Sequence, residues 1–200
     1  MRYARKHNEQ TREKIVATAA RLFREQGIAV GLAKIMAEAG LTVGTFYTHF
    51  KSKEALVREA LRESLLVRPE LLEKALRARD LEQAIRVYLS PEHRDAPGAG
   101  CPTAALAPEV ARHPRPTRHT FMVNLEPTFD VLVELLTARP GKHDATRAEA
   151  AALFGLLAGT LQLARATPDR AQSDAILEAG VRGALRLANG DPHSGAPPGT

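Results

Sequence analysis

The chain has 200 residues, 44% of them hydrophobic and only 4% aromatic, and a net charge of +5. No stretch reaches the roughly 20 apolar residues that span a bilayer, and no apolar run follows the basic N-terminus as in a signal peptide. A single cysteine, Cys101, cannot form an internal disulfide. These features predict a cytoplasmic protein, and the composition can form one small and one medium helical domain.

The first predicted helix covers residues 8–26 and ends at Gly27. Its apolar face is formed by Ile15, Ala19, Leu22 and Phe23. Arg5, Lys6 and Arg12 precede or begin this helix, where we expect them to contact phosphate if the region meets a nucleic acid.

Residues 32–50 have the pattern of a helix-turn-helix. Apolar residues at helical spacing predict a first short helix: Leu32, Ile35, Met36 and Ala39. Gly40 can adopt the left-handed conformation that ends a helix, and Thr42 is a natural N-cap for a second one. The second helix would offer an aromatic face, Phe46 and Phe50, to its own domain and a small, polar face to a major groove. The alternative is an ordinary helical hairpin with an aromatic core.

This pattern gives a set of DNA-facing candidates with small, hydrogen-bonding or basic side chains. They are Lys34, Thr42, Val43, Gly44, Thr45, Tyr47, His49, Lys51 and Lys53. Tyr47 could instead be a core aromatic with its hydroxyl at the surface. His49 is expected to act as a hydrogen-bonding residue and not as a metal ligand, because no second ligand stands at i+3 or i+4.

Charge is concentrated in the same region. Residues 1–65 hold 12 basic and seven acidic side chains, so the whole excess of five positive charges lies there. A protein that binds a polyanion such as DNA needs positive charge at its binding surface. Here that charge lies in the same region as the helix-turn-helix.

The segments 11–27 and 35–56 together resemble the DNA-binding domain of the TetR family of bacterial transcriptional regulators. The resemblance covers about residues 9–62. It implies an all-helical homodimer with an N-terminal domain that binds a near-palindromic operator and a C-terminal domain that dimerises and binds a small-molecule effector. It therefore suggests a repressor with a DNA-binding domain at 1–52 and a ligand-binding and dimerisation domain at 53–188. The loop before Ile35 is about one residue shorter than the family pattern, and Gly31 stands where Ser or Thr often caps the second helix.

Further helices are predicted over 53–67, with Ser52 as N-cap, and then over 69–79, 80–89, 103–112, 116–138, 146–166 and 174–189. Residues 90–102 are rich in helix breakers and predict a loop. The tail 189–200 holds three prolines and three glycines and is expected to be disordered.

Small residues recur every four positions in the last two predicted helices, which suggests close approach of another helix. The dimer-interface candidates are Ala151, Gly155, Gly159, Gly180 and Ala184. Packing inside one subunit is the alternative, because the spacing does not show whose helix approaches.

Residues 100–109 also resemble the effector domain of the subgroup related to the LmrA and YxaF repressors. That resemblance implies a small-molecule pocket after residue 80. Apolar side chains are the lining candidates, although each could be plain core: Tyr88, Leu106, Phe121, Met122, Leu125, Phe129, Phe154 and Leu157.

Motifs for catalysis are missing from the sequence, which has no Gly-x-Ser-x-Gly, no His-Glu-x-x-His and no phosphate-binding glycine loop. We therefore expect neither an enzyme nor a bound cofactor or metal. A constitutive or architectural DNA-binding protein without an effector remains an alternative to a regulated repressor.

Overall fold

The computed structural model describes residues 2–66, 70–139 and 144–190. These residues are helical or in turns and contain no strand, which confirms the predicted all-α fold. Most of the predicted disordered tail, residues 191–200, lies outside the described residues. Over the part of the chain that is described, no helix is long and apolar enough to cross a membrane.

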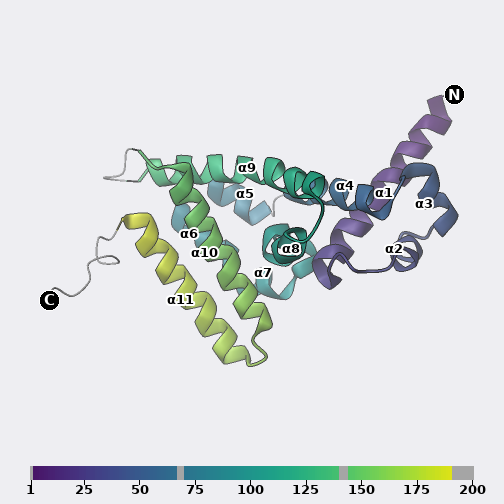
Figure 1. The fold of residues 1–200 in the computed structure, drawn as a ribbon. Helices are drawn as coiled ribbons and strands as arrows, with labels where there is room; N and C mark the ends of the chain where they lie inside the picture. The colour runs from purple at the N-terminus through teal and green to yellow at the C-terminus, as the bar shows by residue number, and fades with distance from the viewer. Residues whose placement is uncertain (1, 67–69, 140–143, 191–200) are drawn as a thin grey trace. The chain divides into compact units, whose positions relative to one another are not determined.

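The helices follow the predicted order (Figure 1). They are α1 (Arg2–Gln26), α2 (Leu32–Glu38), α3 (Val43–His49), α4 (Lys53–Leu66), α5 (Glu70–Arg77), α6 (Leu81–Tyr88), α7 (Pro91–Asp95), the 3-10 turn η1 (Pro97–Ala99), α8 (Pro102–Val110), α9 (Arg115–Thr137), α10 (Arg147–Ala166) and α11 (Arg170–Asn189). Two begin well before their predicted starts: α1 by six residues and α11 by four.

The chain forms two compact units. The first contains Met1–Arg68 and Ala96–Glu126, and the second contains Pro69–Asp95 and Pro127–Thr200. Helix α4 and residues 96–126 thus pack with the N-terminal helices. The predicted division into 1–52, 53–188 and 189–200 is a functional one and stays a prediction.

In the first unit, α1 packs against α2, α4, η1 and α8. The predicted apolar face of α1 is buried, and Phe23 is 1% exposed. Gly27 and Gly40 have φ of 85° and 65°, a left-handed conformation that glycine adopts without strain. These two glycines end α1 and the turn after α2, so the chain can reverse twice within about 15 residues.

In the second unit, α10 and α11 lie side by side (Figure 1). A Cβ atom on Gly180 of α11 would overlap Thr160 of α10 in the same chain, and Ala184 is fully buried. The prediction that these two residues form the dimer interface is therefore wrong. Their small side chains permit close packing inside one subunit, and residue spacing alone could not separate that case from packing between subunits.

Residues 90–102, predicted as a loop, contain α7 and η1 instead. Pro91 is tolerated in the first turn of α7, where its missing N–H would have no helical partner, and Ser90 accepts a hydrogen bond from the backbone N–H of His93 at 3.2 Å. The prediction counted the prolines as breakers, although a proline at a helix start is not one.

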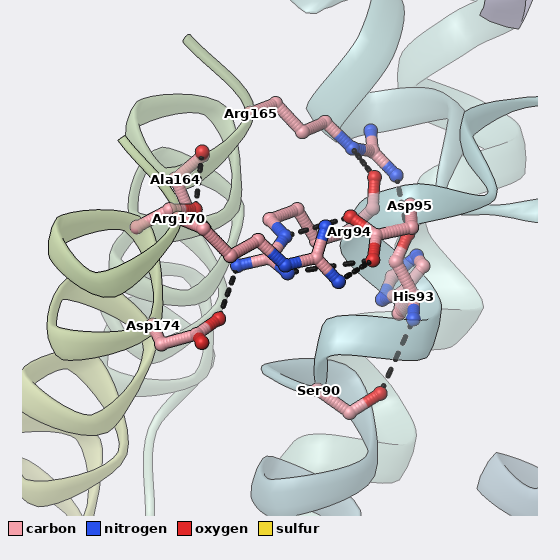
Figure 2. Close-up of polar contacts among 9 residues, drawn as sticks. Ser90, His93, Arg94, Asp95, Ala164, Arg165, Arg170 and Asp174 are labelled. Carbon is pink, nitrogen blue, oxygen red and sulfur yellow. Dashed lines mark hydrogen bonds and ion pairs between the residues drawn. The ribbon is translucent and has the colours of Figure 1, made fainter. Parts of the chain in front are cut away.

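A buried arginine anchors α7 to the hairpin of α10 and α11 (Figure 2). Arg94, 5% exposed, donates hydrogen bonds to the carboxylates of Asp95 and Asp174 and to Ser173 Oγ. In return Arg165 donates to the backbone carbonyls of His93 and Arg94, at 2.8 and 3.1 Å. These contacts join segments some 70 to 80 residues apart in the sequence.

Candidate DNA interface

Helix α3 begins at a side-chain cap. Thr42 has an extended backbone, with φ −87° and ψ 156°, and its Oγ1 accepts a hydrogen bond from Thr45 N at 3.4 Å. The hydroxyls of Thr42 and Thr45 are also 3.0 Å apart, within hydrogen-bond distance. The predicted N-cap is therefore confirmed, and it fixes where the exposed end of α3 starts.

One face of α3 is buried. Phe46 is fully buried and Phe50 is 4% exposed, and their rings stack with centroids 5.5 Å apart. Tyr47, however, is 67% exposed and meets Phe46 only edge-on. The alternative of a core Tyr47 does not hold, so this side chain belongs to the free face.

The free face is broader than predicted. Thr42, Val43, Gly44, Tyr47 and Lys51 are exposed, whereas Thr45 and His49 are half-buried. Thr48 was missing from the predicted set although it is exposed, with its hydroxyl donating to Thr45 O at 2.7 Å. Its position three residues after Thr45 could have placed it on this face. A face of this kind offers hydroxyls for base edges and Val43 for a thymine methyl group.

The two remaining candidate lysines lie apart from that face. Lys34, exposed on α2, donates to Gln26 Oε1 at 2.7 Å. Lys53 is half-buried in the first turn of α4. Burial lowers the pKa of Lys53, and the nearby carboxylates of Glu109 and Glu54 oppose this shift. The Ser52 cap of α4 is confirmed, since Ala55 N donates to Ser52 Oγ at 3.2 Å.

Arg12 has partners within the DNA-binding region. It pairs with Glu59 of α4 at 3.1 Å, and its guanidinium lies 4.8 Å from the centroid of the Phe50 ring. The side chain stays 41% exposed, and its contact with phosphate stays a prediction.

An open groove of about 490 Å³ lies beside the N-terminus of α4. It is lined by Ile28, Ala29, Lys53, Glu54, Val57, Glu109, Arg112, His113 and Pro114. None of the predicted effector-pocket residues lines it. Among the described residues no cluster of three or more His, Cys, Asp or Glu side chains could hold a metal ion.

The predicted effector-pocket residues divide between the two units. Three aromatic candidates meet in the second unit, where the ring centroids of Tyr88 and Phe129 each lie 6.0 Å from that of Phe154, and Leu157 is buried there too. Leu106, Phe121 and Leu125 are buried in the first unit.

Met122 is 45% exposed, whereas Phe121 and Leu125 of the same helix are buried. Its place in the effector pocket stays a prediction.

The exposed face of α10 carries no charge. Its members are Ala148, Ala152, Gly155, Gly159, Leu163 and Ala166, exposed or, for Gly159, half-buried. Leu163 is 63% exposed, and within the described residues a Cβ built on Gly155 or Gly159 would meet no side chain and no other helix within 4 Å. Ala151 is half-buried beside this face.

The fold and the exposed end of α3 are those of a helix-turn-helix protein. Residues 15–60 match the family model described as bacterial regulatory proteins, tetR family. Two Bacillus subtilis proteins described as uncharacterized HTH-type transcriptional regulators are similar: YerO, 46% identical over 50 residues (24% of this chain, 17% of YerO), and YxaF, 32% identical over 119 residues (56% of this chain, 62% of YxaF).

The predicted resemblance to the TetR family is confirmed over residues 15–60. The match to YxaF agrees with the predicted subgroup. The aligned parts span less than two thirds of both Bacillus proteins. The reduced form of NemR from E. coli has the same fold, with a TM-score of 0.70 at 23% identity over 88% of this chain and 95% of NemR.

Proposed function

We propose that this protein is a cytoplasmic, dimeric transcriptional repressor that occupies a near-palindromic operator and leaves it when a small molecule binds. The observation that carries the proposal is the free N-terminal half of α3, with Tyr47 67% exposed beside the small residues Val43 and Gly44. A helix with a small, polar N-terminal end can approach base edges closely in a major groove. The excess positive charge of residues 1–65 supports the phosphate contacts that this docking needs.

Pairing of two copies follows from the uncharged face of α10. A helix face of alanine, glycine and leucine that none of the described residues covers is costly to leave in water, and a second copy could cover it symmetrically. Gly155 and Gly159 would let two α10 helices approach closely. Two recognition helices must then lie about 34 to 36 Å apart to enter successive major grooves.

The effector is expected to be a neutral or apolar small molecule. FadR from Bacillus subtilis, which shares this fold with a TM-score of 0.59 at 19% identity, was solved with stearoyl-CoA. In this chain the aromatic cluster of Tyr88, Phe129 and Phe154 is the favoured place for an apolar ligand. A protein without an effector would stay on its operator in the presence of every candidate compound, which separates the constitutive alternative from a regulated repressor.

Replacing Thr45 by alanine is expected to weaken operator binding by about 5- to 10-fold while changing binding to scrambled DNA less than about twofold, because one base contact is lost. The matched variant Lys51→Ala should weaken binding to both DNAs and reduce the salt slope by about one unit. Fluorescence anisotropy at several salt concentrations measures both effects. Equal losses on both DNAs for Thr45→Ala would remove Thr45 from the base-reading set.

A further inference from the structure

The helix-turn-helix has both of its ends fastened to a segment far along the chain. This segment, residues 109–117, is here termed the α8–α9 corner, and it belongs to the same compact unit as α1 to α4. The helix-turn-helix begins after the turn at Gly27 and is followed by the first residues of α4. Contacts at these two places decide how α2 and α3 are held on the rest of the unit.

At the entry, the backbone N–H of Ile28 donates to Glu109 Oε2 at 2.8 Å. Ile28 follows the left-handed Gly27, so its N–H points away from α1 and needs an acceptor from elsewhere. The fit is close, because a Cβ on Gly27 would lie 2.8 Å from Glu109 Oε1. Glycine at position 27 thus permits the left-handed turn and leaves room for the carboxylate of Glu109.

At the exit, donor and acceptor change sides. The accepting carboxylate belongs to the helix-turn-helix side, and its hydrogen-bond donors belong to the α8–α9 corner. Glu54, in the first turn of α4, accepts hydrogen bonds from Thr117 Oγ1 and from His113 Nδ1, the latter at 3.1 and 3.2 Å. Partial burial acts to raise the pKa of Glu54, but these hydrogen bonds, together with the nearby charges of His113 and Arg58, outweigh it and the pKa lies below the ordinary value. Thr117 is fully buried, so its hydroxyl has no water to replace Glu54.

Glu54, Glu109, Ile28 and His113 all line the open groove of about 490 Å³. Where the corner meets the two ends of the helix-turn-helix, space is therefore left between them, and the hydrogen bonds of Glu109 and Glu54 connect the two sides. Helix α9 continues from this corner past Glu126 into residues of the second unit.

We propose that Glu109, together with His113 and Thr117, positions the helix-turn-helix for operator binding through this two-ended clasp. The inference rests on the proposed DNA-binding function, but it assigns the effect to residues more than 50 positions after α3. The clasp holds α3 at the orientation in which its free face can enter the major groove of the operator DNA. A change that frees the corner lowers operator affinity without touching any DNA-facing residue.

The test compares Glu109→Ala with Glu109→Gln in the full-length protein. Both variants remove one negative charge, which by electrostatics alone would tighten DNA binding. The glutamine oxygen can still accept the Ile28 hydrogen bond, whereas alanine cannot. We expect Glu109→Ala to bind operator about 10-fold more weakly, and Glu109→Gln to stay within about twofold of the wild type.

Amide hydrogen exchange of the DNA-free protein gives an independent readout. Peptides covering residues 28–50 should exchange several-fold faster in Glu109→Ala, and not in Glu109→Gln. Arg112→Ala is the matched control, because Arg112 lines the same groove and its hydrogen bond within the described residues is made by its backbone N–H to Glu109 O, which alanine keeps. It should leave this exchange unchanged. Thr117→Val tests the other end and should also weaken operator binding, with a thermal melt confirming that each variant folds.

If Glu109→Ala matches Glu109→Gln in both operator affinity and exchange, the clasp is refuted. If the wild type binds operator and scrambled DNA equally, the proposed function fails, and the exchange of residues 28–50 still decides the clasp.

Discussion

Replacing Arg94 by methionine is expected to lower the free energy of unfolding by about 3 kcal/mol, near the low end of the range for breaking a buried ion pair. The side chain is 5% exposed and donates to Asp95, Ser173 and Asp174. The loss stays near the low end because the side chains of Asp95 and Asp174 are 41% and 50% exposed and can be solvated once Arg94 is gone. Helix α7 would then lose its main tie to α11.

Urea unfolding followed by circular dichroism measures this loss. Arg94→Lys is the matched control, since it keeps the charge but not the planar fork, and it should lose part of the same free energy. The hydrogen bond from Arg94 lowers the pKa of Asp95 to about 2. The stability from this contact is therefore present above about pH 4 and lost as the pH falls toward 2, and the methionine variant should lack this part of the acid dependence. Unchanged stability in Arg94→Met would show that the cluster is not structural.

Replacing Leu163 by glutamate is expected to raise the dissociation constant of the dimer by at least about 100-fold, because a symmetric interface would bury the charge twice. Leu163 is 63% exposed in the single chain and continues the uncharged face of Gly155 and Gly159. Operator affinity should fall with dimerisation, since one recognition helix reads only a half-site. Sedimentation velocity over a concentration series measures the dimer directly.

The control for this variant is Val123→Glu, which places the same charge on an apolar side chain of α9 that is 47% exposed. It should leave the dimer intact. Dissociation of the Val123 variant, with an intact Leu163 variant, would move the interface away from α10.

The helix-turn-helix could be predicted from the sequence because local contacts define it. The caps of α3 and α4 join residues only three positions apart, Thr42 with Thr45 and Ser52 with Ala55. The capping box at Thr146 is equally local. Such contacts depend on residue type and spacing, which a sequence shows directly.

Contacts between distant segments could not be predicted from the sequence. Arg12 is near Glu59, and Gly180 is near Thr160, only because helices from different parts of the chain pack together. The same holds for Arg94, which stabilises a short helix in a segment predicted as a loop. Helical spacing shows that a face is small or apolar, but not which helix covers it.

The proposed function requires that this protein recognise a specific operator. Footprinting on the DNA upstream of its own gene and the neighbouring genes, at two salt concentrations and with a scrambled control, measures this recognition. We expect a protected near-palindrome whose half-site centres lie one helical turn of DNA, or a multiple of it, apart. Equal and strongly salt-sensitive binding to both DNAs, without a protected site, would contradict it.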